Sequence, residues 1–208
     1  MSRSPVEPTA GAALLEELFS SRVRAAVLCQ LLPRPHLGFS LTELSRLLGL
    51  AISSLQHECY KLERLGVLVG RREGNAYRYR GNAESVLHGP LTSLVVAAIG
   101  EEATLRAMLD AVPGVHAAFL AGNVPKANGD GTAPLVVIGE VPLEELDALE
   151  SRPAAVLNLA PTAIELAYYR PEDWRTKLQQ ANPFVMSILK GNRLDLVSND
   201  GLIPAILS

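Results

Sequence analysis

Long apolar runs are missing from this 208-residue sequence, and none approaches the roughly 20 residues that a helix needs to cross a bilayer. Residues 1–11 also lack the charged start and the apolar stretch of a secretory signal peptide. These two absences argue against a membrane-spanning or secreted protein. We therefore expect a cytoplasmic protein.

Cysteine is scarce as well. The two cysteines, Cys29 and Cys59, each lie within an apolar helical pattern, which is typical of small core residues. Neither has the spacing of a disulfide framework or of a zinc site. We expect no metal and no other cofactor.

Charge is distributed unevenly along the chain, although the net charge is only −3. Residues 22–80 carry ten Lys and Arg against four Glu, a balance of +6. Residues 81–208 carry eight Lys and Arg against fifteen acids, a balance of −7. A basic first half suggests that this half alone faces a polyanion such as DNA. The alternative is that both halves simply have differently charged solvated surfaces.

The first part of the chain has helical periodicity. Residues 1–12 are predicted to be a disordered tail, because they are rich in Pro, Ser and Gly. Apolar spacing predicts a helix over residues 14–32, with a possible break at Ser20 and Ser21. A second helix begins at Ser40, where Ser40 and Glu43 have the spacing of a capping box.

This second helix is expected to end at Gly49. Its expected buried stripe consists of Leu41, Leu44, Leu47 and Leu48.

A third helix is predicted over residues 52–65, only three or four residues after the second one, which is helix-turn-helix spacing. Two strand-like runs follow, at residues 67–71 and 76–80. Residues 72–75 between them contain Gly and Asn, which tolerate a tight hairpin turn. The pattern indicates a wing after the third helix.

The second half of the sequence alternates strand and helix signals. The expected strands are residues 115–121, 135–139 and 163–169, and the expected helices are residues 91–111, 143–150, 171–180 and 183–189. We predict an α+β protein in four parts: a tail (1–12), a winged helix-turn-helix domain (13–88), a linking helix (89–112) and a small α/β domain (113–208).

The third helix has two distinct faces. Leu55, Cys59 and Leu62 fall on one line at about 100° per residue, which predicts the buried side. The opposite side carries donors and cations that can reach phosphates and base edges in a major groove. The predicted DNA-contacting residues of the helix and wing are Ser53, Ser54, Gln56, His57, Tyr60, Lys61, Arg64, Arg71, Arg72, Asn75 and Arg78.

Within this set, the cations Lys61, Arg64, Arg71, Arg72 and Arg78 are expected mainly at phosphates. The side chains of Ser53, Ser54, Gln56 and His57 are the candidates for contacting bases. The alternative is an ordinary solvated polar face on a three-helix cluster.

Three segments carry a resemblance to a known family: LFSSRVR at 18–24, SLTELSRLLGL at 40–50 and LERLGVL at 62–68. They resemble the ArsR-like winged-helix regulators of bacteria and archaea, over about residues 14–85. The resemblance implies a homodimer on a pseudo-palindromic operator, with the helix after Gly49 as the recognition helix.

The sequence departs from this family at Ala51, where a capping Ser or Thr is usual. It also has no metal-sensing cysteine pair, so no metal response is carried over.

The remainder resembles the minimal nucleotidyltransferase-like domain to which one subgroup of these regulators is fused. The segments are AAFLAG at 117–122, LVVIG at 135–139, YRPEDW at 169–174 and NPF at 182–184.

In active members, a Gly-Ser pair ends the first strand, and an Asp-x-Asp pair on the second strand holds the magnesium ions. Here Asn123 follows Gly122, and Ala133-Pro134 replaces the Asp pair. The resemblance therefore implies a degenerate domain, and we expect no enzymatic activity.

Our leading expectation is a dimeric DNA-binding transcriptional regulator whose second domain serves dimerisation, partner contact or the sensing of an unknown small-molecule effector. One alternative is a nucleotidyltransferase for a protein, RNA or small molecule, using Asp130 and Glu165 with one metal ion. Another alternative is a protein-binding adaptor, because winged helices also mediate protein contacts. The loop at 123–132 is expected to be a plain surface loop, although its glycines could hold an anion.

Overall fold

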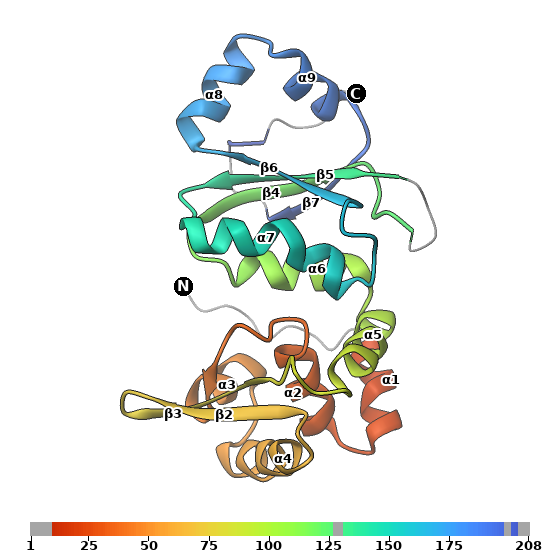
Figure 1. Cartoon of the computed structure of the whole chain (residues 1–208), viewed down its shortest axis with the longest axis vertical. Helices are drawn as coiled ribbons and strands as arrows, with labels where there is room; N and C mark the ends of the chain where they lie inside the picture. Colours follow the sequence, from red (N-terminus) through yellow and green to blue (C-terminus); the bar gives the residue numbers. More distant parts are fainter. Residues whose placement is uncertain (1–9, 127–130, 198–200, 204–208) are drawn as a thin grey trace. The chain divides into compact units, whose positions relative to one another are not determined.

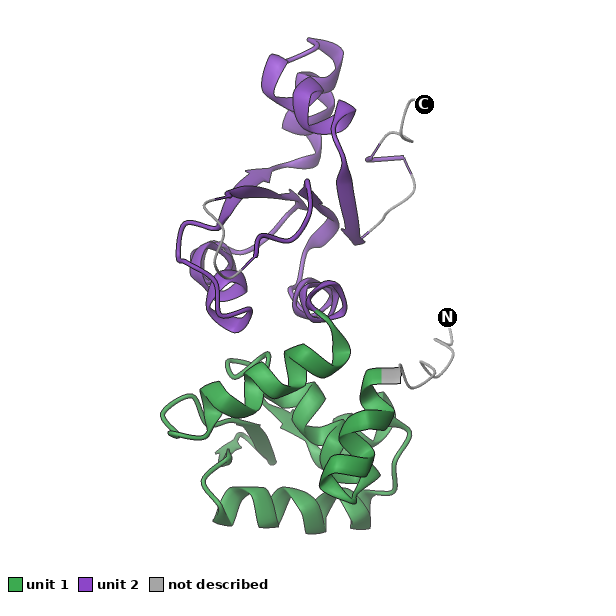
Figure 2. Cartoon of the chain, turned by 90° about the vertical axis from the view of Figure 1, so that its right-hand side faces the viewer, with its two compact units in different colours: residues 1–100 green, residues 101–208 purple. Residues whose placement is uncertain are grey.

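The computed structural model describes residues 10–126, 131–197 and 201–203. The chain divides into two units, residues 1–100 and residues 101–208 (Figure 2). Both units contain helices and strands, which confirms the expected α+β class. Within the described residues, no helix has the length and apolar character needed to cross a membrane.

Unit 1 is mainly helical and carries one small sheet. Its described elements, in chain order, are α1 (Ala10–Phe19), α2 (Arg22–Leu31), β1 (Phe39–Ser40), α3 (Leu41–Leu48), α4 (Ile52–Arg64), β2 (Leu68–Glu73), β3 (Ala76–Gly81) and α5 (His88–Ile99). The predicted break between α1 and α2 is confirmed: Ser20 adopts a φ of 49°, and the Ser21 side chain caps α2 by accepting from the Arg24 N–H. Helix α1 begins at Ala10, so the predicted disordered tail is wrong for residues 10–12, and residues 1–9 lie outside the described residues.

The capping box predicted at α3 is present. The Glu43 N–H donates to Ser40 Oγ, and the Ser40 N–H donates to the Glu43 carboxylate at 2.8 Å. Gly49 ends the helix in the left-handed conformation, as expected. The prediction for Leu47 is wrong, because 57% of it is exposed. Leu44 points into the core, and Leu47 lies at the margin of the arc that faces inward.

Helix α4 follows α3 after residues 49–51, and its buried line is the one predicted. Leu55 and Cys59 are fully buried, and Leu62 nearly so, in the core that unit 1 forms between its helices and hairpin. Burial raises the pKa of the Cys59 thiol to about 12, so it stays protonated as a small core side chain. This packing leaves the opposite side of α4 facing solvent.

The hairpin after α4 is slightly longer than predicted. Strands β2 and β3 pair from Leu68 opposite Gly81 to Glu73 opposite Ala76, which leaves Gly74 and Asn75 as a two-residue turn. Gly74 has a φ of 60°, the sign that this type of turn requires. The tip of the hairpin projects away from the helices of the unit (Figure 1). Strand β1 pairs with β3 on the other side, so the order of the small sheet is β1-β3-β2 in the described chain.

The predicted helix over residues 91–111, and with it the linking helix over 89–112, is wrong. The structure has two helices there, α5 and α6 (Glu101–Asp110), separated by Gly100 with a φ of 91°. The apolar periodicity continues across this glycine, but its backbone conformation is not helical. The division between the two units falls at the same place.

Unit 2 is built around a mixed sheet. Its described elements are α6, β4 (Val115–Ala121), β5 (Ala133–Gly139), α7 (Leu143–Val156), β6 (Ile164–Tyr169), α8 (Pro171–Gln179), α9 (Pro183–Lys190) and β7 (Arg193–Val197). The strand order is β6-β5-β4-β7 among the described residues. Strands β5 and β6 are parallel, whereas β4 is antiparallel to both of its neighbours. Strand β7 was not predicted, and α7 continues six residues beyond its predicted end at residue 150.

Helices cover both faces of this sheet: α6 and α7 lie on one face, and α8 and α9 on the other (Figure 1). On the second face, the Trp174 side chain is fully buried and packs against Phe119 and Tyr169. The indole N–H donates to the Leu202 carbonyl at 2.8 Å. Trp174 is thus the central core residue beneath α8.

Candidate nucleic-acid interface

The solvent-facing side of α4 carries most of the residues that the sequence predicted for DNA contact. The predicted residues that are exposed on this helix are Ser53, Ser54, Gln56, His57, Tyr60 and Arg64. Lys61 is partly exposed, and the Arg64 guanidinium lies 5.9 Å from the centre of the Tyr60 ring. The structure therefore brings neutral hydrogen-bonding groups and two cations together on one helix surface.

Glu58, the acid in the middle of α4, does not lie on this surface. Only 7% of Glu58 is exposed, and its carboxylate accepts from Arg24 Nε at 2.9 Å and from Lys61 Nζ at 3.3 Å. Burial acts to raise the pKa of Glu58, but the hydrogen bonds and charges of Arg24 and Lys61 outweigh it, and the pKa is lowered. The carboxylate is therefore ionised and neutralised inside unit 1, where it anchors α4 to α2.

The hairpin adds a second exposed group of side chains. Arg71, Arg72 and Asn75 are all exposed near its tip. The side chains of Arg71 and Arg72 make no ion pair or hydrogen bond within the part of the chain that the structure describes. Two guanidinium groups at this position are free to meet an external anion.

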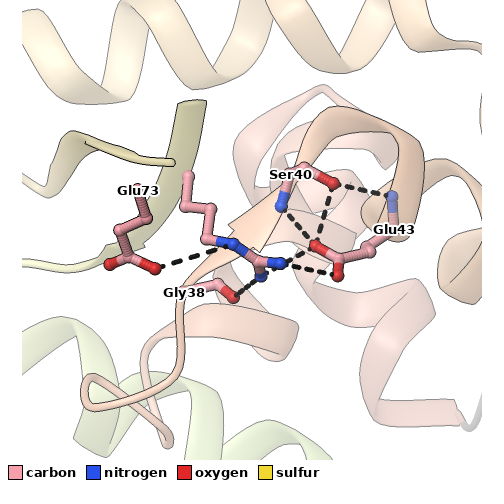
Figure 3. Close-up of polar contacts among 5 residues, drawn as sticks. Gly38, Ser40, Glu43 and Glu73 are labelled. Carbon is pink, nitrogen blue, oxygen red and sulfur yellow. Dashed lines mark hydrogen bonds and ion pairs between the residues drawn. The ribbon is translucent and has the colours of Figure 1, made fainter. Parts of the chain in front are cut away.

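Arg78 requires a correction, because its guanidinium is already bound within unit 1. It donates to the Gly38 carbonyl at 2.7 Å and to both oxygens of Glu43 at 2.9 and 3.0 Å, and its Nε lies 3.6 Å from the Glu73 carboxylate (Figure 3). A guanidinium with this two-pronged carboxylate contact is not available as a free phosphate ligand. Arg78 instead tethers β3 to the start of α3.

A second carboxylate ties α4 to the hairpin. Glu63 accepts from the Tyr77 hydroxyl at 2.7 Å and from the Gly70 N–H at 3.1 Å. The Tyr77 ring lies over Gly70, where an added Cβ would come within 2.3 Å of the ring. The hydrogen bond to Glu63 raises the pKa of Tyr77, because loss of the phenol proton would place two negative charges together. Glu63, like Glu58, is thus engaged in contacts within unit 1, although its side chain is only partly buried.

The sequence predicted neither the contact between Arg78 and Glu43 nor the contact between Glu63 and Tyr77. Glu43 was recognised as a capping residue, but its bond to Arg78 joins positions 35 residues apart. Nothing in local periodicity encodes such a pair.

The bond between Glu43 and Arg78 leads to a prediction about acid stability. The Ser40 backbone N–H is the main cause of the lowered pKa of Glu43, and the Ser40 hydroxyl and Arg78 contribute further. Because folding lowers this pKa, the ionised Glu43 carboxylate stabilises the fold at pH values above its ordinary pKa of 4.5. This contribution is lost as the pH falls through the lowered pKa. We expect Glu43→Gln to reduce the free energy of unfolding by on the order of 1 kcal/mol at neutral pH. The difference from the unsubstituted protein should vanish in acid, as measured by urea unfolding at a series of pH values.

Glu73→Gln is the matched control, because Glu73 contacts the same guanidinium from a more exposed position. It should change stability much less than Glu43→Gln does. A difference for Glu43→Gln that persists unchanged down to the lowest pH at which the protein stays folded would contradict this account of the carboxylate.

The positions that resemble a nucleotidyltransferase site offer few ligands. Strand β5 begins at Ala133, two residues earlier than predicted, and Pro134 lies opposite Glu165 of β6. Glu165 is exposed, and Asp130 lies outside the residues that the structure describes. Across the described positions, no group of three or more His, Cys, Asp or Glu side chains lies close enough to hold a metal ion.

Comparisons with protein-family models, with characterised proteins and with solved structures found no match to this chain.

Proposed function

We propose that this chain is a sequence-specific double-stranded DNA-binding regulator of transcription. In this proposal unit 1 is a winged helix-turn-helix domain, with α4 as the recognition helix and the β2–β3 hairpin as the wing. The observation that carries the proposal is the exposed surface of α4, which presents hydrogen-bonding groups and cations while both of its acids are held in internal contacts.

The chemistry of this surface suits a duplex. A B-DNA major groove is about 12 Å wide and admits an α-helix, whose polar side chains can then reach base edges. Ser53, Gln56 and His57 lie in the first half of α4 and are the proposed base contacts. Lys61 and Arg64 lie in its last turns and are the proposed phosphate contacts; Lys61 also pairs with Glu58, but its side chain stays partly exposed.

The wing supplies further cations. Arg71 and Arg72 are exposed on β2 beside the turn, where they can follow the phosphate backbone or enter the adjacent minor groove. Arg78 has a positioning role in this proposal, since its bonds to Glu43 hold the wing against α3.

We further propose that the protein acts as a homodimer and that unit 2 is a catalytically inactive nucleotidyltransferase-like module. Nucleotidyl transfer is not part of the proposal, because Ala133 and Pro134 at the start of β5 provide no carboxylate for magnesium. The roles left for unit 2 are dimerisation, partner contact and binding of a small effector.

The proposal is tested by selecting bound fragments from random duplex DNA at a stated salt concentration. We expect enrichment of a two-fold symmetric motif with half-sites about one helical turn apart. If no duplex is retained even at low salt, DNA binding is refuted and a protein-binding adaptor becomes the better explanation.

The base contacts proposed on α4 give a second prediction. Gln56→Ala combined with His57→Ala should flatten the base preference at one or two positions of each half-site, at a cost of about 1 to 3 kcal/mol against the preferred site. Binding to unrelated duplexes should change little, because phosphate contacts remain. The measurement compares affinities for the selected motif and for single-base variants of it.

Gln179→Ala is the control for this experiment, since Gln179 is exposed on α8 in unit 2. An unchanged base preference in the Gln56 and His57 double variant would remove the first half of α4 from the proposed base contacts.

A further inference from the structure

Unit 2 contains an open groove at one edge of its sheet. Its volume is about 790 Å³, and its lining includes His116, Glu140, Tyr168, Arg170 and Arg175. Small-molecule sites in proteins have volumes of about 300 to 1,000 Å³, so the groove has a suitable size.

The groove lies where the parallel strands β5 and β6 end. Glu140 directly follows β5, and Arg170 follows β6 at the start of α8. Both strands run towards this edge, as their arrows show (Figure 1). In open sheets that contain parallel strands, ligands bind outside the carboxyl ends of the strands, where loops leave a crevice.

This edge is opposite to the one that a nucleotidyltransferase-like site would use. That site would lie at the end of β4 and the start of β5. The groove is instead lined by His116, near the start of β4, because β4 is antiparallel to β5 and pairs Val115 with Gly139. The groove is therefore separate from the degenerate site described above.

Two residues that line the groove are hydrogen-bonded to neighbouring backbone. The Tyr168 hydroxyl donates to the Gly139 carbonyl at 2.8 Å, and the Glu140 N–H donates to the Gly114 carbonyl at 2.8 Å. An added Cβ at Gly114 would come within 2.1 Å of the Glu140 carbonyl oxygen, so the two backbone segments are in close contact. Backbone packing therefore fixes the positions of Glu140 and Tyr168 beside the groove.

Both signs of charge line this groove. Arg170 and Arg175 supply guanidinium groups, and Glu140, Glu172 and Asp173 supply carboxylates. Within the described ranges, these five side chains form no ion pair with one another or with any other group. Their charges are thus available to a bound molecule.

The balance of these charges selects the ligand class. A purely anionic ligand would meet three carboxylates, and a purely cationic ligand would meet two guanidinium groups. We infer that the groove binds a small zwitterion, that is, an amino acid or short peptide whose carboxylate contacts the arginines and whose ammonium contacts the acids. The inference concerns unit 2 alone and does not depend on DNA binding.

The test uses the full chain and a panel of free amino acids and dipeptides, studied by isothermal titration calorimetry without DNA. At least one zwitterion should bind, and its N-acetylated and C-amidated relatives, which each lack one charge, should bind about tenfold or more weakly. If no compound of the panel binds, or if a singly charged relative binds equally well, the inference is overturned.

Variants locate the binding in the groove. Arg170→Ala and Glu140→Ala should each weaken binding of the zwitterion about tenfold or more, since both residues are exposed and their side chains support no other described contact. Lys190→Ala and Glu150→Ala are the matched controls, because they remove exposed charges of the same signs from α9 and α7 outside the groove. Equal binding by all four variants would place the ligand elsewhere and overturn the inference. Thermal unfolding of each variant, measured alongside, separates loss of binding from loss of fold.

Discussion

Replacement of both Arg71 and Arg72 by alanine should weaken binding to every duplex, by roughly tenfold to a hundredfold at about 0.1 M salt. Both guanidinium groups are exposed beside the hairpin turn and have no partner within the described chain. Each phosphate contact releases counterions, and its loss lowers the slope of log K against log salt by about 0.9. The double variant should therefore reduce this slope by about 1.8, with base preference unchanged.

A suitable control removes the same charge elsewhere. Lys126 and Lys190 are exposed in unit 2, so Lys126→Ala with Lys190→Ala changes the net charge equally. This control should leave the slope nearly unchanged. If the Arg71 and Arg72 variant keeps the full slope, the hairpin does not contact phosphates and the proposed wing is wrong.

Trp174→Ala should reduce the free energy of unfolding of unit 2 by about 3 to 5 kcal/mol. The side chain is fully buried against Phe119 and Tyr169, so its removal leaves a large cavity. It also leaves the Leu202 carbonyl without its indole donor. Because domains are stabilised by only about 5 to 15 kcal/mol, a substantial part of unit 2 should unfold.

Hydrogen exchange is the appropriate measurement, because Trp174 is the only tryptophan and its replacement removes the fluorescence signal. Protection should fall in β4 and β5 while α2 and α4 of unit 1 keep theirs. Trp174→Phe should cost much less, because an aromatic ring remains. Phe184→Ala is the exposed control on α9. Unchanged protection of β4 in the Trp174→Ala variant would show that this core is not what stabilises the sheet.

Elements defined by local chemistry could be predicted from the sequence. The box formed by Ser40 and Glu43, the left-handed Gly49 and the buried line of α4 all depend on residues within one or two turns of each other. For the same reason, the exposed positions of α4 were predicted almost completely. The hairpin turn was found through its Gly and Asn.

Features defined by distant contacts could not be predicted in this way. The burial of Glu58 depends on Arg24, and the binding of Arg78 depends on Glu43, in both cases more than 30 residues away. The local sequence around a Lys or Arg is the same whether its side chain faces solvent or pairs with a carboxylate from a distant segment.

The helices at 91–111 show a different limit of periodicity. Apolar residues on both sides of Gly100, such as Ala98 and Leu105, keep helical spacing, but the backbone angle of that glycine separates α5 from α6. Strand β7 was missed because its sequence, RLDLV, alternates over only five residues.

The Glu43 carboxylate contacts two elements: it accepts from the Ser40 N–H at the start of α3, and it binds the guanidinium of Arg78 on β3. An outward movement of the hairpin would break the bonds between Arg78 and Glu43 and leave the carboxylate that caps α3 without its guanidinium partner. In the proposed DNA complex, α4 and the hairpin would contact the duplex at a fixed separation. Operators should then keep an invariant number of base pairs between the groove entered by α4 and the backbone stretch reached by the hairpin, and inserting a base pair there should abolish one of the two contacts.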